Sequence, residues 1–165
     1  MTEPDVSGRP DVTTEQVIAH LPPSVLDQRM GIEIVEATRD RVVARMPVEG
    51  NTQPLGLLHG GASCVLAESA GSIAATIHGA PTHYAVGVEI NCSHHRGVRE
   101  GFVTATATPI RAGRQVATYH IEIVDDAGRS IATARLTCLL QPVEIDETAI
   151  RAVGRASSGS TQSTR

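Results

Sequence analysis

Residues 59–79, HGGASCVLAESAGSIAATIHG, decide the fold of this chain. Nearly all of them are small or apolar, and the only acidic residue among them is Glu68. A helix through this stretch would have apolar side chains on every side, which predicts a helix that is buried all round. Its alanines and glycines, such as Gly71, would let neighbouring backbone pass close by. The Gly-Ala-Pro sequence at 79–81 ends the predicted helix.

Six segments around this helix have the patterns of β-strands. Two of them precede the helix and read as a hairpin, and four follow it with glycine- and aspartate-rich turns between them. Because the connections among the last four are short, they predict a four-strand antiparallel meander. The expected fold class is α+β, an antiparallel sheet curled around one long helix. The six segments are 31–37, 41–48, 84–92, 102–110, 116–124 and 130–140.

The length of 165 residues predicts one domain with short tails. The domain is expected at 25–142. Residues 1–24 form an N-terminal extension, in which Thr13 begins a short helix that runs to about His20. Residues 143–165 form a C-terminal tail that is expected to be largely disordered, since its end is rich in Ser, Thr and Gly.

The composition excludes several classes of function. The net charge of −4 and the presence of only three aromatic residues argue against a nucleic-acid binder. All fourteen basic residues are arginine, so no lysine is present to form a Schiff base or a P-loop. Three cysteines without a C-x-x-C pair fit neither a disulfide framework nor a zinc ribbon. No apolar run is long enough to span a membrane, and the N-terminus lacks the apolar core of a signal peptide, so we expect a cytoplasmic protein.

Glu68 is the most informative residue for function. A carboxylate on a buried helix costs several kcal/mol unless it is paired, so chains keep one mainly for a purpose. Ser72 lies one turn further along on the same face. The backbone amides at the start of the helix could stabilise a developing oxyanion, and His59, Gly60 and Gln53 lie in or just before this turn. The alternatives are a surface glutamate or a dimer salt bridge for Glu68, and a plain turn before the helix.

A second cluster of polar residues ends the strand at 84–92. A metal site of Cys92, His94 and His95 is disfavoured, because adjacent strand residues face opposite ways and no carboxylate or second cysteine pair accompanies them. Four arginines near strand ends and turns are either solvated surface groups or ligands for a phosphate-bearing molecule. These are Arg96, Arg99, Arg111 and Arg114.

Residues 53–74, QPLGLLHGGASCVLAESAGSIA, resemble the active-site signature of the hotdog-fold acyl-CoA thioesterases. The similarity continues through GVEINCSHHRGVREG at 87–101 and, more loosely, RLTCLL at 135–140. Within that family the chain most resembles the PaaI-like branch, which holds the 1,4-dihydroxy-2-naphthoyl-CoA thioesterases and the enterobactin proofreading thioesterases. The resemblance covers roughly residues 25–142.

The resemblance implies a long helix wrapped by a six-strand antiparallel sheet, in homodimers or homotetramers whose active sites are shared between subunits. It implies that Glu68 is the nucleophile or general base and that the Gly60 amide polarises the thioester carbonyl. Gln53 and His59 would orient the thioester, and Ser72 would place water or the substrate ring. The implied acyl-CoA lining is Gly87, Asn91, His94, His95, Arg96, Gly97, Arg111, Ala112, Gly113, Arg114, Gln115 and Val116. Arg111 departs from close relatives, which more often have histidine there.

The residues themselves, without the resemblance, are consistent with thioester hydrolysis. A thiol leaves easily as thiolate, so the site needs a base or nucleophile and an oxyanion donor but no strong acid. The expected reaction is hydrolysis of acyl-CoA, with an aromatic acyl group such as 1,4-dihydroxy-2-naphthoyl, and without a metal or a cofactor besides the CoA of the substrate. The alternatives are a hotdog hydratase, whose His/Asp arrangement is not found here, and a catalytically silent acyl-CoA-binding protein.

Overall fold

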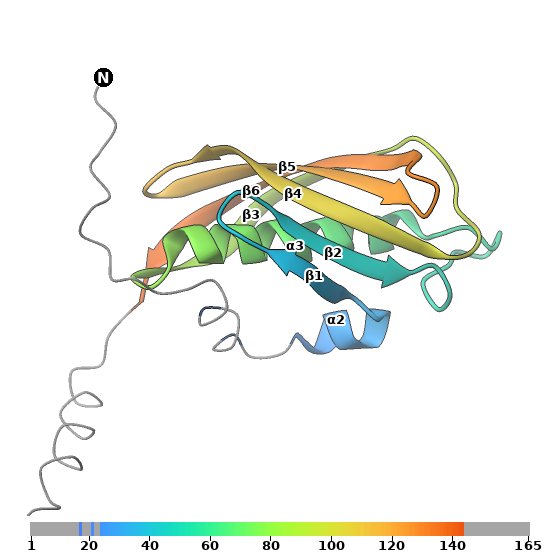
Figure 1. The fold of residues 1–165 in the computed structure, drawn as a ribbon, viewed down its shortest axis with the longest axis horizontal. Coiled ribbons are helices and arrows are strands. Elements are labelled where there is room, and N and C mark those ends of the chain that lie inside the picture. Colours follow the sequence, from blue (N-terminus) through green and yellow to red (C-terminus); the bar gives the residue numbers. More distant parts are fainter. Residues whose placement is uncertain (1–16, 18–20, 22–23, 144–165) are drawn as a thin grey trace, which may run out of the picture.

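The computed structural model describes residues 17, 21 and 24–143, and in them a six-strand antiparallel sheet curls over one long helix (Figure 1). The predicted α+β class is confirmed, and the predicted strands match the observed ones to within a few residues. Most of the N-terminal helix and the C-terminal tail that we predicted lie outside the described residues. The elements are α2 (Val25–Met30), β1 (Glu33–Ala37), β2 (Val42–Pro47), α3 (Gly60–Gly79), β3 (His83–His94), β4 (Phe102–Ala112), β5 (Val116–Asp125) and β6 (Ser130–Pro142).

The order of the strands in the sheet is β1-β2-β4-β5-β6-β3. The predicted four-strand meander is therefore wrong at its first connection, because β3 pairs with β6 and not with β4. The reason is that the two edges of β4 are already taken, one by β2 and the other by β5. This arrangement leaves β1 and β3 as the edge strands.

A β-bulge divides β3 into two halves. Gly87 pairs with Cys138 and Glu89 pairs with Thr137, so Val88 is an extra residue on this strand. The side chains that face the helix side therefore change from odd to even numbers along the strand. They are Ala85 and Gly87 before the bulge, and Ile90, Cys92 and His94 after it.

The core between the sheet and α3 is aliphatic, as the composition predicted. Tyr119 is the only aromatic side chain among its buried residues, and Leu66 and Ala70 of α3 are fully buried in it. Gly71 allows close packing of α3 on β6, because a Cβ there would lie 2.6 Å from Cδ2 of Leu136. The absence of a side chain on Gly71 therefore permits the short distance between α3 and the sheet at this point.

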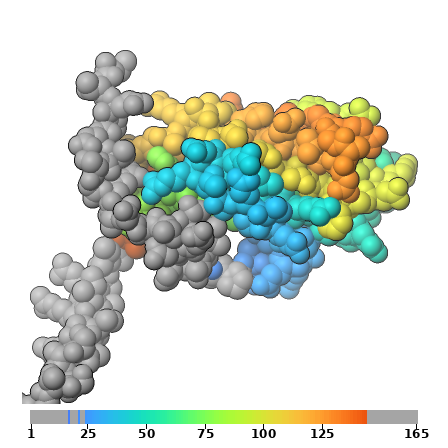
Figure 2. Space-filling model, in the orientation of Figure 1, coloured from blue at the N-terminus to red at the C-terminus, as the bar shows by residue number. Residues whose placement is uncertain are grey.

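One stripe of α3 is only half-buried, which corrects the expectation that this helix is buried all round. The sheet covers the rest of α3, and from the side shown in Figure 2 only a small part of it is visible between the strands. The short helix α2, which the sequence analysis missed, lies beside the stripe and is joined to it by a hydrogen bond from Ser69 Oγ to Asp27 Oδ1 of 2.8 Å. Ser24 at its start and Gly31 at its end, with φ of 68°, are the caps that mark α2 in the sequence. The stripe consists of Cys64, Val65, Glu68, Ser69, Ser72, Ile73 and Thr76.

Candidate active site

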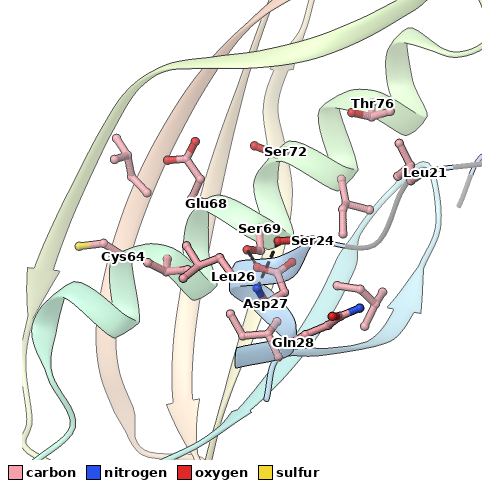
Figure 3. A pocket seen from close by; sticks show the side chains of 15 residues that line it. Leu21, Ser24, Leu26, Asp27, Gln28, Cys64, Glu68, Ser69, Ser72 and Thr76 are labelled. Atoms are coloured by element: carbon pink, nitrogen blue, oxygen red, sulfur yellow. Dashed lines mark hydrogen bonds between the residues drawn. The ribbon is translucent and has the colours of Figure 1, made fainter. Parts of the chain in front are cut away.

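A cavity of about 800 Å³ runs along the half-buried stripe of α3. Figure 3 shows Glu68 and Ser72 projecting from successive turns of α3, and α2, which contributes Asp27 and Gln28 to the lining, lying next to Ser69. The other walls carry some polar groups, among them the Asp27 carboxylate that accepts a hydrogen bond from Ser69, and a larger number of apolar side chains. The apolar ones include Leu26, Ile32, Ile34, Val65, Ile73 and Ile90.

The carboxylate of Glu68 is directed at β3, where Gly87 makes room for it. A Cβ on Gly87 would overlap Glu68 Oε1. The neighbouring strand residue Cys138, which pairs with Gly87, completes this niche, although sequence reasoning did not assign it to the site. Burial, followed by the nearby charge of Glu68, raises the pKa of the Cys138 thiol to about 11, so this thiol is neutral near pH 7. Glu68 therefore lies among neutral groups, and Cys138 is no competing nucleophile.

The start of α3 presents backbone amides, as the sequence predicted. His59 is the N-cap residue, and its Nδ1 accepts a hydrogen bond of 2.8 Å from the Gly61 amide. The first amides of a helix have no acceptor within the helix, so the Gly60 amide remains a donor for a ligand. Because Nδ1 of His59 is an acceptor, the neutral ring carries its proton on Nε2. Gln53 Oε1 accepts from the Leu55 amide, which leaves the side-chain NH₂ of Gln53 as a donor.

A second cavity, of about 410 Å³, lies at this end of α3. It is lined by Gln53 and Gly60 together with the predicted segment His94, His95, Arg96 and Gly97. The expectation that His94 and His95 cannot share one cavity is wrong, because β3 ends at His94 and strand alternation does not extend to His95.

The two remaining predicted lining residues on β3, Gly87 and Asn91, lie on opposite faces of the strand. Gly87 borders Glu68, whereas Asn91 lies on the outer face and donates a hydrogen bond of 2.9 Å from Nδ2 to Glu89 Oε1. Asn91 therefore does not face either cavity within its own chain.

The other predicted segment, Arg111 to Val116, lies at the far end of α3. It includes the turn between β4 and β5, where His78 in the last turn of α3 hydrogen-bonds through Nε2 to the Gly113 carbonyl at 3.0 Å. A helix of 20 residues is about 30 Å long. The two segments predicted to hold one acyl-CoA molecule are thus at opposite ends of α3 in a single chain.

Among the described residues, one group has the ligand atoms and the spacing for a metal ion. It consists of Cys64, Cys92 and His94, whose ligand atoms all lie within 4.8 Å of one another. The combination considered from the sequence contained His95 in place of Cys64. In the structure His95 lies beside Thr133 instead, with 3.0 Å between Nε2 and Oγ1. All three cysteines of the chain are free thiols. Burial and the adjacent Cys64 raise the pKa of the Cys92 thiol to about 12.

Comparison with known proteins gives consistent results. A model of the thioesterase superfamily matches residues 55–132. The proofreading thioesterase EntH of Cronobacter turicensis is 43% identical over 113 residues, which are 68% of this chain and 82% of that protein. No helix in the described part of the chain has the length and apolarity needed to cross a bilayer.

Solved structures resemble the fold over nearly their whole length. Thioesterase HI1161 of Haemophilus influenzae superposes with a TM-score of 0.74 at 36% identity, covering 83% of this chain and 96% of its own. A mutant of thioesterase PA1618 of Pseudomonas aeruginosa gives a TM-score of 0.72 at 39% identity, covering 82% and 98%. The chain therefore belongs to the thioesterase superfamily of hotdog-fold proteins and is a thioester hydrolase.

Proposed function

We propose that this thioesterase hydrolyses acyl-CoA with Glu68 as the catalytic carboxylate and with an aromatic acyl group as the preferred substrate. The observation that carries the proposal is the position of Glu68, which lies in a niche of neutral groups and borders a large cavity with largely apolar walls. A flat aromatic group such as 1,4-dihydroxy-2-naphthoyl suits a cavity of this size and lining. Ser72, one turn from Glu68, would place water or a ring hydroxyl.

The separation of Gly60 and Glu68 supports a site shared between two subunits. Eight residues of α-helix separate them, which is about 12 Å along the axis. The oxyanion donor and the attacking group must both reach one carbonyl, and a glutamate side chain cannot span that separation. The Gly60 amide of one subunit would therefore act together with Glu68 of the partner subunit, across a two-fold axis that sets the two α3 helices antiparallel.

The distribution of the lining segments supports the same arrangement. Two antiparallel α3 helices bring the end that carries His94–Gly97 in one subunit near the end that carries Arg111–Val116 in the other. The edge strand β3 is the surface for this pairing, because it has an unpaired edge and exposes Tyr84, Val86 and Val88. We propose a homodimer built in this way, which doubles to a tetramer.

The reaction follows from these positions. Amides at the start of α3, with Gln53 and His59, would bind the thioester oxygen and stabilise its negative charge as the carbonyl carbon becomes tetrahedral. Glu68 supplies the electron pair, either by direct attack or by taking a proton from an attacking water. The C–S bond then breaks, and CoA leaves as the thiolate and takes up a proton from solvent. If water is the attacking group, the free acid is released directly; if Glu68 attacks, the acyl group is left on Glu68 as an anhydride, which water hydrolyses to release the acid and restore the carboxylate. No metal or cofactor takes part in these steps, and the three free thiols agree with a cytoplasmic location.

Replacement of Glu68 by glutamine tests the role of this residue. Glu68→Gln keeps the shape of the side chain and should lower kcat at least about a hundredfold while aryl-CoA still binds. Glu122→Gln, an exposed glutamate on β5, is the matched control and should retain activity. A kcat of Glu68→Gln within about tenfold of wild type would refute the assignment. Failure of the wild-type protein to release free CoA from any aryl-CoA would refute the aromatic acyl group, and failure with aliphatic acyl-CoA as well would favour the silent acyl-CoA-binding protein.

A complementation experiment tests the shared site. Glu68→Gln and Gln53→Ala chains, each with a different affinity tag, are co-expressed, and the mixed dimers are purified. If Gln53 of one subunit acts with Glu68 of the other, each mixed dimer contains one site with both substitutions and one intact site. It should then recover about half of the wild-type activity per dimer, although each variant alone is inactive. Inactive mixed dimers would show that both residues act within one chain.

A further inference from the structure

Two thiols and an imidazole converge beside the start of α3, and the two thiols have no part in the hydrolysis proposed above. Cys64 is one turn into α3, and Cys92 and His94 stand on the helix-facing side of β3 beyond the bulge. The bulge is what directs these two side chains toward α3. The cluster is thus assembled by the fold from residues almost thirty positions apart.

His94 is held in a defined position within this cluster. Its Nε2 packs against Gly60, where an added Cβ would lie 2.9 Å away. The opposite ring nitrogen, Nδ1, lies 4.0 Å from Cys92 Sγ. One edge of the ring is therefore fixed by the helix and the other is directed at the sulfur atoms.

The spacing of these atoms is close to that of a tetrahedral zinc site. Zinc lies about 2.3 Å from thiolate sulfur and about 2.0 Å from imidazole nitrogen, so tetrahedral angles separate sulfur and nitrogen by about 3.5 Å. The observed 4.0 Å between Cys92 Sγ and His94 Nδ1 needs only a small contraction to reach it. All three ligand atoms lie within 4.8 Å of one another, which leaves room for an ion between them.

We propose that Cys64, Cys92 and His94 bind one Zn²⁺ ion through two thiolates and one imidazole nitrogen. Soft sulfur ligands favour Zn²⁺ over Mg²⁺ or Ca²⁺, which prefer oxygen. Three protein ligands leave the fourth tetrahedral position for water, and Cys64 borders the cavity that contains Glu68. The site is therefore accessible from the cavity, unlike a closed structural zinc site.

A bound ion would also affect hydrolysis, a consequence that rests on the proposed function. Cys64 is four residues before Glu68, so their side chains leave the same face of α3 about 5–6 Å apart at Cβ. A cation at Cys64 would attract the Glu68 carboxylate and reduce its ability to attack or to take a proton. Saturating Zn²⁺ should therefore inhibit the wild-type enzyme, and the Cys64→Ser variant should be resistant at the same ion concentration.

Cobalt spectroscopy on the reduced, chelator-treated full-length chain tests binding independently of activity. Wild-type protein should bind one Co²⁺ per chain, with a thiolate-to-cobalt charge-transfer band and the intense visible bands of tetrahedral cobalt. Added Zn²⁺ should remove these bands at one equivalent per chain. Absence of the charge-transfer band would overturn the proposal, whatever the outcome of the activity assays.

Matched variants assign the ligands. Cys64→Ser, Cys92→Ser and His94→Ala should each weaken Co²⁺ binding at least about tenfold. Cys138→Ser and His95→Ala, which remove the third thiol and the adjacent imidazole, should retain the bands. Circular dichroism checks that each variant is folded, and if one ligand variant is not, the other two decide the result. Loss of the bands in His95→Ala but not in His94→Ala would refute the assignment, and so would their persistence in both cysteine variants.

Discussion

The carboxylate of Glu68 occupies the space that a side chain at position 87 would take, so Gly87 and Glu68 form a matched pair across the interface of α3 and β3. Gly87 is the last helix-facing residue before the bulge of β3, and its partner Cys138 lies beside it on β6. The carboxylate thus has a fixed position among neutral neighbours, which an acid–base or nucleophilic group requires.

Substitution of Gly87 by alanine should displace this carboxylate. We expect Gly87→Ala to fold and to lower kcat at least about tenfold, because a misplaced catalytic group can cost up to about a hundredfold. Steady-state kinetics with an aryl-CoA substrate measures the loss. Aspartate is shorter than glutamate, so Glu68→Asp should cost less activity in the Gly87→Ala background than in the wild type. Additive losses in the double variant would indicate that the two residues do not act on each other.

Arg96 and Arg114 are the residues that we expect to contact the phosphates of CoA. Both are exposed, and they lie at opposite ends of α3. Phosphate contacts stabilise the ground state and the transition state alike, so Arg96→Ala or Arg114→Ala should raise KM more than it lowers kcat. A charge-assisted contact of about 1.5–3 kcal/mol corresponds to a rise in KM of about ten- to a hundredfold.

Truncated substrates provide the control for this prediction. Pantetheine thioesters lack the nucleotide, so neither arginine variant should raise their KM. Arg39→Ala, in the turn between β1 and β2, should leave both substrates unaffected. Equal effects on CoA and pantetheine substrates would assign Arg96 and Arg114 a structural role.

The turn between β5 and β6 should make stability depend on pH. Asp125 accepts hydrogen bonds from the amides of Ala127 and Arg129 and from the Arg129 guanidinium, at 3.0, 2.9 and 2.7 Å. The Arg129 guanidinium holds the pKa of this carboxyl below its ordinary value of 3.8. The ionised form thus stabilises the fold above the unfolded pKa, and the contribution is lost as the pH falls through the lowered value.

Urea unfolding between pH 7 and pH 2 measures this effect. Asp125→Asn should lower the free energy of unfolding at pH 7 and flatten its decline below about pH 4. Asp40→Asn, at an exposed position between β1 and β2, should leave the decline nearly unchanged. A decline as steep in Asp125→Asn as in wild type would contradict the assignment.

Leu66 is a test of the core beneath the site. It is fully buried where α3 packs on the sheet, so Leu66→Ala should lower the free energy of unfolding by about 2–5 kcal/mol. Leu55→Ala, at a side chain that is 74% exposed, should change it by no more than about 0.5 kcal/mol. Similar losses for the two variants in denaturant titrations would contradict the observed packing.

Local patterns in the sequence were sufficient to place the six strands and the long helix α3. The alternation in 116–124 and the small residues of 59–79 determine a strand and a buried helix without reference to distant residues. The strand order was not accessible in this way, since pairing of β3 with β6 depends on the occupation of both edges of β4. The helix α2 was missed although Ser24 and Gly31 mark its ends, because six residues carry too weak a periodicity.

The candidate site shows the same division. Glu68 and Gly60 could be proposed as site residues because the pattern of residues 59–79 predicts the helix that carries both of them. The contact of Glu68 with Gly87 and the convergence of Cys64 on Cys92 were not predictable, since each joins two elements through a bulge whose position the sequence does not reveal. Spacing along a chain cannot indicate that β3 ends at His94, and that both adjacent histidines therefore line one cavity.

The bulge at Val88 allows β3 to lose one residue without turning the side chains that follow to the opposite face of the sheet. Deletion of Val88 would leave Gly87 paired with Cys138 and Glu89 with Thr137, so the same residues would still face the helix. A deletion or insertion at any other position of the strand would turn its remaining residues over to the opposite face. In descendants of this chain, loss of the codon for Val88 is therefore compatible with an intact niche for the Glu68 carboxylate.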